Sequence, residues 1–535
     1  MPIRAASCGC GSGWRRMATE RRAVRGLAWL GALRGWRGLL AYAALGGLAA
    51  LGHAPFDIWP LTVLALGAAI GAFAVAPGGR WWAFGRGWAL GLGYFAVGWN
   101  WLVEPFLVQP EIFGWMAPFA LALLSGAMAL YWAGAGLIAH VIGGAAPWRR
   151  MAALAGAIAL AETFRGTWFT GFPWGMVAYV WIETPLSQAL AWIGPHGLTL
   201  ATLLAAGGAG TALATGRGWL WPGVVVVAGA LAALVLAPGA APGPDPDAPV
   251  VRLVQSGAEQ AEKWLPGNAQ RFLDLQLGYT GAGDPPDLAI WSETAVPYLL
   301  RDAGPVLSAI SAATRGGTAI AGIQRYADGS YFNSMVAVDP AGTVTDTYDK
   351  MHLVPYGEYL PFENLMRALG LRGLAANIDA GFRPGAARAP IEVPGIGPVW
   401  PIICYESIFP AEVGDWQARP RLIVLITNDA WFGRFSGPYQ HLAQGRARAI
   451  EQGVPMVRVA QTGVSAMIDA RGRVTASIPL GTAGWVDAAL PPERPATAYA
   501  RSGDWPALAA IWALLLGVAA LRVARRGIDP ARGAA

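Results

Sequence analysis

The sequence predicts a multi-span α-helical membrane protein, with about eight transmembrane helices and an α/β domain inserted before the last of them. The chain has 535 residues, of which 55% are hydrophobic and only 13% are charged, whereas soluble proteins carry about 25% charged residues. The apolarity is also uneven. Residues 28–238 and 505–524 are almost continuously apolar, while residues 249–500 have the composition and length of an ordinary globular domain.

A helix needs about 20 apolar residues to cross the hydrocarbon core of a membrane. Segments that approach this length lie near residues 36–53, 59–77, 84–103, 113–142, 151–168, 187–214, 218–237 and 505–524. Glu162 and Arg165 interrupt the fifth of them. An ion pair on the helix surface would explain both residues. Ionisable residues inside a membrane are also functional candidates, and Arg165 is then a candidate contact for a phospholipid headgroup.

The arginines predict the orientation of the spans. Basic clusters occur before the first span, in every second loop and after the last span, whereas loops 53–60 and 104–113 contain no lysine or arginine. Because positively charged loops stay in the cytoplasm, both chain ends are expected inside and residues 249–500 outside. The net charge of +6 therefore reflects membrane topology, and no nucleic-acid partner is expected.

The remaining boundaries follow from composition. We expect residues 1–27 to be a disordered basic tail, within which Met17 is a candidate start of translation, and residues 525–535 to be a cytoplasmic tail. The stretch 237–249 is rich in proline and glycine and is typical of a linker. Two of the three cysteines lie in the N-terminal tail, which leaves Cys404 without a partner on its side of the membrane. No disulfide framework is expected.

Between residues 249 and 500, short β-branched runs alternate with helix-like stretches. The runs begin at residues 250, 288, 318, 334, 399, 422 and 455, and the helix-like stretches are 267–279, 303–314 and 439–452. This alternation predicts an α/β domain in which helices cover sheets.

Three polar residues follow these runs, where catalytic groups of such folds tend to lie. Glu293 follows LAIWS, Lys350 lies within TYDKMHLVPYGEYLP, and Cys404 follows VWPII. A thiol near its free pKa of ~8.5 is mostly protonated, so a nucleophilic cysteine needs a base or a positive neighbour. Glu293 can accept the proton. Lys350 and the backbone N–H of Tyr405 can hold a developing oxyanion.

Each of these residues alone has a plainer explanation. Cys404 could be a small buried hydrophobe, Glu293 a helix cap and Lys350 a solvated loop charge. His352 and His441 lack the spacing of metal ligands, so we expect no metal. No nucleotide or other cofactor motif occurs, and no cofactor is expected.

Together, the motifs IWSETA, YDKMHLVPYGEYLP and CYES resemble the Glu–Lys–Cys signatures of the nitrilase, or carbon–nitrogen hydrolase, superfamily. The eight-span frame is similar to one membrane branch, the apolipoprotein N-acyltransferase family. The segments EKWLPG, RGTWFTGFPW, TNDAWFG and HLAQGRARAIEQGVPMVRVAQTGVSA also resemble that family. The resemblance covers nearly the whole chain after the N-terminal tail. Ser292 stands where the family often has a proline, which should alter the turn more than the chemistry.

The resemblance implies a nitrilase-like αββα sandwich for residues 249–500, facing the periplasm from a bacterial inner membrane. Cys404 would take the sn-1 acyl chain of a phospholipid, typically phosphatidylethanolamine, as a thioester. The acceptor would be the N-terminal amine of the S-diacylglyceryl cysteine of an apolipoprotein. A monomer is expected.

The resemblance also implies roles for single residues. Glu293 would be the general base, Lys350 the oxyanion stabiliser and Cys404 the nucleophile. Glu358 would hold Lys350 or Glu293 in place. Three further residues would support the site or the substrate, and these are Trp264, Tyr405 and Glu406.

Some alternatives stay open at this point. Residues 362–379 could be a packed helix or a lid that dips into the bilayer to admit acyl chains. A membrane-tethered amidase that passes the acyl-enzyme to water would need the same three catalytic residues. A transporter or scaffold with an inactive outer domain is disfavoured, because all three are present.

Overall fold

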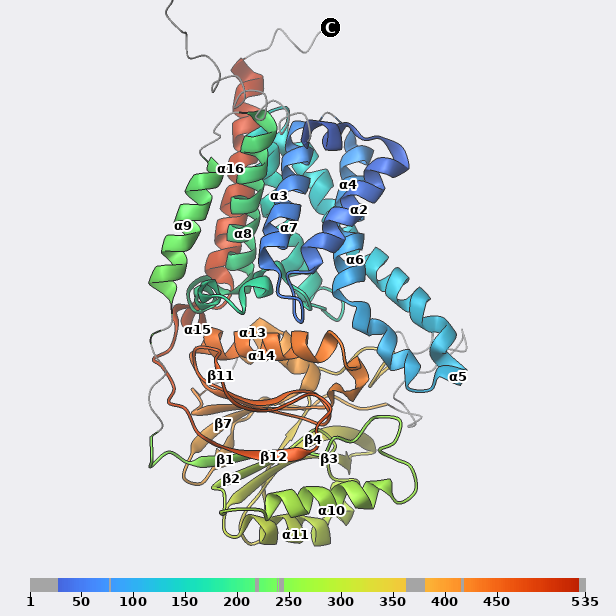
Figure 1. Ribbon diagram of the computed structural model, residues 1–535, viewed down its shortest axis with the longest axis vertical. Helices are drawn as coiled ribbons and strands as arrows, with labels where there is room; N and C mark the ends of the chain where they lie inside the picture. Colours follow the sequence, from blue (N-terminus) through green and yellow to red (C-terminus); the bar gives the residue numbers. More distant parts are fainter. Residues whose placement is uncertain are drawn as a thin grey trace, which may run out of the picture.

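The computed structural model describes residues 27–76, 78–216, 221–237, 239, 245–361, 381–414 and 418–528. The predicted lid segment, most of the N-terminal tail and the residues after 528 lie outside this part of the chain. The described residues form a helical half and an α/β half, and the last helix returns from the α/β half into the helical bundle (Figure 1).

The helices of the helical half coincide with the predicted apolar segments. They are α2 (Gly35–Ala50), α3 (Trp59–Val75), α4 (Arg80–Gly98), α6 (Ala117–Gly143), α7 (Pro147–Thr167), α8 (Leu190–Thr215), α9 (Trp221–Leu236) and α16 (Trp505–Ile528). By length and composition, three described helical segments can cross a membrane, and these are Pro110–Gly143, Pro185–Thr215 and Trp505–Ala524. The number of eight spans therefore stays a prediction.

Short helical turns connect the long helices. They are η1 (Asn100–Leu107), α5 (Pro110–Phe113), η2 (Gly114–Met116), η3 (Val177–Trp181) and η4 (Pro185–Ala189). The predicted span 84–103 thus ends at Gly98, and α8 is broken near its start, where Gly194 has a φ of 62°. Pro195, next to it, has no N–H to donate and favours the break.

The α/β half is a sandwich of two six-stranded sheets. The first sheet has the order β12 (Gly484–Ala489), β1 (Val250–Gln255), β2 (Leu288–Trp291), β3 (Thr318–Ala327), β4 (Ser330–Val338), β5 (Val344–Asp349). The second has the order β11 (Val474–Ile478), β10 (Ser465–Ile468), β9 (Met456–Ala460), β8 (Leu422–Thr427), β7 (Gly397–Ile403), β6 (Ile391–Val393). In each sheet three strands pair in parallel, β1–β2–β3 and β7–β8–β9.

Helices cover both outer faces of the sandwich (Figure 1). The first sheet carries α10 (Asn268–Thr280) and α11 (Gly304–Thr314). The second carries α13 (Pro410–Val413) and α14 (Gly437–Gln452), which lie between that sheet and the helical half. The prediction of an α/β domain with helix-covered sheets is confirmed. The remaining short helices are η5 (Leu300–Asp302), η6 (Cys404–Ile408), η7 (Asp429–Phe432) and α15 (Ala498–Ser502).

Helices α3 and α8 approach each other closely because glycines face each other between them. A Cβ added at Gly210 would lie 1.8 Å from the carbonyl oxygen of Gly67, and one added at Gly71 would lie 2.5 Å from the carbonyl oxygen of Gly210. The two helix backbones therefore touch directly at these glycines. A larger residue at any of these positions would force the helices to shift apart.

We expect Gly210→Ala to lower the thermal unfolding midpoint of the detergent-solubilised protein, because overpacking costs about 1–3 kcal/mol. Gly229→Ala in α9 is the matched control, since its added Cβ meets nothing within 4 Å. An unchanged midpoint for Gly210→Ala would contradict the described packing of α3 on α8.

Candidate active site

The three predicted catalytic residues lie at the carboxyl ends of strands. Glu293 follows β2, Lys350 follows β5 and Cys404 follows β7, so both sheets contribute. All three are buried. Lys350 Nζ lies 3.6 Å from Glu293 Oε1, and the Cys404 thiol interacts electrostatically with both charged groups. The structure thus brings together the residues that the three motifs supply.

Both oxygens of the Glu293 carboxylate are oriented by hydrogen bonds. Asn333 Nδ2 donates to Oε1 at 2.7 Å, and the backbone N–H of Asn428 donates to Oε2 at 2.7 Å. A carboxylate held at both oxygens keeps one position, which suits a general base that must face a fixed thiol.

Glu358 is in direct contact with Lys350. Lys350 Nζ lies 2.9 Å from Oε2 and 3.0 Å from Oε1 of Glu358. The backbone N–H of Val354 donates to Oε2 at 2.8 Å, and Asn333 Nδ2 donates to Oε1 at 2.9 Å. Asn333 therefore links the carboxylates of Glu293 and Glu358, with the Lys350 ammonium between them.

Cys404 occupies a strained turn between β7 and η6. Its φ is 52°, in the left-handed region that non-glycine residues rarely adopt and that costs of order 1–3 kcal/mol. Its carbonyl oxygen accepts a hydrogen bond from Ser407 Oγ at 2.9 Å and lies 3.3 Å from His441 Nε2. These contacts hold the backbone in the strained conformation.

The surroundings of Cys404 favour the protonated form of its thiol. Burial raises the pKa of Cys404 above its ordinary value and the Glu293 charge raises it further, while Lys350 and a hydrogen bond with Thr427 lower it by less. Burial lowers the pKa of Lys350, but Glu358, Glu293 and Cys404 raise it by more, so this ammonium stays charged. A protonated thiol beside a carboxylate and a permanent cation is suited to base-assisted attack on a carbonyl.

Glu406 connects the segment that carries Lys350 to the segment that carries Cys404. Its buried carboxylate accepts hydrogen bonds from the Tyr348 hydroxyl at 2.7 Å and from the backbone N–H groups of Met351 at 2.8 Å, His352 at 3.3 Å and Ile403 at 2.7 Å. Burial raises the pKa of Glu406, and these donors lower it by less. Through these hydrogen bonds Glu406 links the two segments.

Tyr405 and Trp264 lie at the edges of the site. The Tyr405 hydroxyl donates to the carbonyl oxygen of Gly171 at 3.1 Å, which ties η6 to the helical half. Trp264 is 50% exposed, and Lys263 Nζ lies 5.1 Å from the centre of its ring. Among the predicted supporting residues, Trp264 is the one that the structure places outside the buried group.

Sequence reasoning missed Asn333 and Lys263. Asn333 lies within β4, and asparagine is depleted in strands, so its position was a usable signal. Lys263 Nζ donates to Thr294 Oγ1 at 2.9 Å and to Gln461 Oε1 at 2.7 Å. Burial lowers the pKa of Lys263 to about 7, against the opposing effect of Glu293. Lys263 lies within EKWLPG, one of the segments that carry the resemblance, but its contacts come from distant parts of the chain.

Residues 45–208 match the family model described as apolipoprotein N-acyltransferase N-terminal domain, and residues 265–499 match carbon–nitrogen hydrolase. The apolipoprotein N-acyltransferase of Brucella melitensis is 37% identical over 496 residues, which cover 86% of this chain and 91% of that protein. That of Rhodopseudomonas palustris is 35% identical over 533 residues, which cover 93% and 96%. This chain belongs to the apolipoprotein N-acyltransferase family.

A CN-hydrolase superfamily protein from Xanthomonas campestris is 19% identical, with a TM-score of 0.35, and the match covers 50% of this chain and 97% of that one. The family-model match over residues 265–499 assigns the α/β half, with its two six-stranded sheets, to the carbon–nitrogen hydrolase fold.

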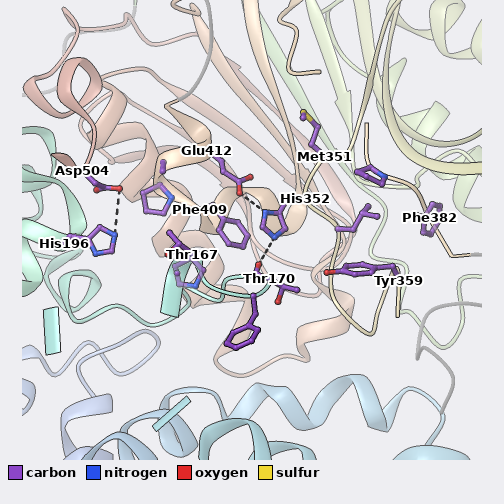
Figure 2. Close-up of a pocket in the computed structure, with 17 residues that line it drawn as sticks. Thr167, Thr170, His196, Met351, His352, Tyr359, Phe382, Phe409, Glu412 and Asp504 are labelled. Atoms are coloured by element: carbon purple, nitrogen blue, oxygen red, sulfur yellow. Dashed lines mark hydrogen bonds and ion pairs between the residues drawn. The ribbon is translucent and has the colours of Figure 1, made fainter. Parts of the chain in front are cut away.

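A cavity of about 600 Å³ lies where the two halves of this acyltransferase-family chain meet (Figure 2). The labelled residues that line it are Thr167, Thr170, His196, Met351, His352, Tyr359, Phe382, Phe409, Glu412 and Asp504. None of the three predicted catalytic residues is among the described residues of its wall. The cavity adjoins the segments that follow Lys350 and Cys404.

The described residues contain no group of three or more His, Cys, Asp or Glu side chains arranged to hold a metal ion. The absence of a metal and of a cofactor stays a prediction.

We expect Glu406→Gln to lower the thermal unfolding midpoint and the reactivity of Cys404 together. The amide replaces one accepting oxygen with a donor, so buried N–H groups lose their acceptor at a cost of about 1–3 kcal/mol each. Thermal unfolding and alkylation of Cys404 by iodoacetamide measure the two effects. Glu392→Gln, at an exposed position of β6, is the control and should change neither quantity.

Alkylation should also report the protonation of Cys404. Because the pKa of this thiol is raised in the folded state, its thiolate forms only as the pH rises above the midpoint of a free cysteine, about 8.5. Lys350→Met removes a cation that lowers this pKa and should move the profile to still higher pH. Mass spectrometry of the Cys404 peptide across the pH range measures the rate, and a plateau reached at or below pH about 8.5 would contradict the assignment.

Proposed function

We propose that this chain transfers an acyl group from a phospholipid, through a thioester on Cys404, to the N-terminal amine of the S-diacylglyceryl cysteine of an apolipoprotein. Membership of the apolipoprotein N-acyltransferase family over most of the chain supports lipoprotein N-acylation. The mechanism rests on one observation. Glu293, Lys350 and the protonated Cys404 are buried close together, at the carboxyl ends of strands from both sheets.

In the first step, Cys404 Sγ attacks the carbonyl carbon of the sn-1 ester, and the thiol proton passes to Glu293. The charge that develops on the carbonyl oxygen is held by Lys350 Nζ and by the backbone N–H of Tyr405, in the first turn of η6. The ester C–O bond then breaks. Glu293 returns its proton to the leaving oxygen, which gives a lysophospholipid and the thioester.

In the second step, the amine of the lipoprotein cysteine attacks the thioester and gives its proton to Glu293. The C–S bond breaks, an amide forms, and Cys404 recovers its proton from Glu293. Thioester formation divides a difficult ester-to-amide transfer into two easier steps. Both substrates are anchored in lipid, so a site fixed at the membrane surface meets them at high effective concentration.

The proposal places the helical half in a bacterial inner membrane as seven spans within residues 28–238, with an eighth span at 505–524. The α/β half, residues 249–500, then faces the periplasm. Phosphatidylethanolamine is the proposed donor and a monomer the proposed state. The described helices at each predicted span support this topology.

The alternative is a membrane-tethered amidase that passes the acyl group to water. The match of residues 265–499 to carbon–nitrogen hydrolase fits either reaction. The match of residues 45–208 to the N-terminal domain of apolipoprotein N-acyltransferase favours transfer.

Mass spectrometry of the Cys404 peptide tests the proposal. We expect purified protein incubated with phosphatidylethanolamine alone to acquire a hydroxylamine-labile acyl adduct, which a diacylglyceryl lipopeptide then removes as the lipopeptide gains the acyl mass. Cys404→Ala should form no adduct, and Glu293→Gln should form it about 10²–10⁴-fold more slowly. If the adduct decays equally fast without lipopeptide, the result favours the amidase. If no adduct forms in active membranes, the proposed thioester on Cys404 is refuted.

A further inference from the structure

Near the end of α7, Glu162 and Arg165 form a completely buried ion pair. Both side chains have an exposed fraction of 0%. Arg165 Nη2 donates to Glu162 Oε2, Arg165 Nε donates to Oε1 at 3.2 Å, and Trp132 Nε1 donates to the same Oε1 at 2.8 Å. The expected ion pair between these two residues is therefore present, but it is buried inside the protein rather than on its surface. With no exposed area, Arg165 is not placed to contact a lipid headgroup directly, as the sequence also allowed.

The remaining side of the Arg165 guanidinium holds the loop that follows α7, residues 168–176, here called the α7–η3 loop. Arg165 Nη1 donates to the carbonyl oxygen of Phe172 and, at 2.9 Å, to that of Trp174. The planar fork of arginine can contact a carboxylate and these carbonyls at once, which the single ammonium of lysine cannot reproduce. Arg165 therefore fixes this loop against its own helix.

The α7–η3 loop in turn supports the segments that carry the catalytic residues. Its Gly171 carbonyl accepts the hydrogen bond of Tyr405, the residue after Cys404. Its Thr170 carbonyl lies 3.0 Å from Nε2 of His352, two residues after Lys350 (Figure 2).

A third contact runs from the same loop through α14. Trp174 Nε1 donates to Gln440 Oε1 at 2.8 Å. The Trp174 ring stacks on the His441 ring, with centroids 5.5 Å apart, and His441 Nε2 lies 3.3 Å from the carbonyl oxygen of Cys404. Three independent contacts thus connect the loop held by Arg165 to the surroundings of the thiol.

We propose that Arg165, held by Glu162, is a positioning residue for Cys404: it fixes the α7–η3 loop as the support on which the segments of Cys404 and Lys350 rest. The inference rests on the proposed function, because Cys404 acylation is the chemistry that it positions. Cys404 has a strained backbone, with a φ of 52°, which persists only where its surroundings over-determine it. A displacement of about 1 Å of a reacting group can cost about 100-fold in rate.

The test is single-turnover acylation of full-length Arg165→Lys from phosphatidylethanolamine vesicles, followed by mass spectrometry of the Cys404 peptide. We expect the rate constant of thioester formation to fall about 100-fold, while the final fraction of acylated Cys404 stays at the wild-type level. A residue needed only for folding would lower that final fraction and leave the rate constant of the remaining molecules unchanged.

Arg150→Lys is the matched control. Arg150 is also a buried arginine of α7, but its Nη1 donates to the carbonyl oxygen of Ala76, away from the α7–η3 loop. Its variant should keep the wild-type rate constant. Glu162→Gln is the second variant, because it keeps the shape of the ion pair. It should lower the rate constant of thioester formation about tenfold. This variant tests the proposal if Arg165→Lys fails to fold.

The outcomes separate the two proposals. If the wild-type protein forms no thioester, the proposed function fails. If the wild-type protein forms the thioester, two results with a folded variant, Arg165→Lys or Glu162→Gln, would overturn the positioning role of Arg165. One is a wild-type rate constant of thioester formation, and the other is a loss confined to the final fraction of acylated Cys404. An equal decrease of the rate constant in Arg150→Lys would overturn it as well.

Discussion

The group of predicted catalytic residues depends on one buried cation between two carboxylates. Lys350 Nζ contacts Glu358 at 2.9 Å and lies 3.6 Å from Glu293. Removal of three charges from water is costly, and only close pairing with further hydrogen bonds offsets it. Asn333 supplies those hydrogen bonds to both carboxylates. This arrangement keeps the lysine charged, while burial and the Glu293 charge raise the pKa of the Cys404 thiol. Both effects suit the proposed base-assisted attack without a histidine.

This group is assembled from three parts of the molecule. The two sheets supply Glu293, Lys350 and Cys404, and Glu406 fastens the segments of the latter two to each other. The helical half supplies the α7–η3 loop, against which Tyr405 and His352 are held. The geometry of the site therefore depends on how the sandwich docks on the helices as well as on the sandwich itself.

The sequence predicted the parts of this structure that are local and periodic. Strands β1–β4 and β7–β9 were found from β-branched runs, whereas β5 and β11 (VTDTYD and VTASI) were missed because polar residues break their apolar pattern. The predicted catalytic residues came from three motifs. Asn333 and Lys263 contact the predicted catalytic group through residues from distant parts of the chain. The segments EKWLPG and RGTWFTGFPW, which contain Lys263 and most of the α7–η3 loop, were recognised as family-like, but the sequence did not show which residues they contact.

Helix α14 has buried residues on every side. Ala443 and Ala447 pack against η3 and α8 of the helical half, while Ala449 packs against the second sheet. Without its helices, the α/β half would expose this apolar surface to water. The order of the chain suits that requirement, because the residues of η3 and α8 are synthesised long before those of α14. During biogenesis the membrane helices can thus act as a template on which the enzymatic half completes its folding.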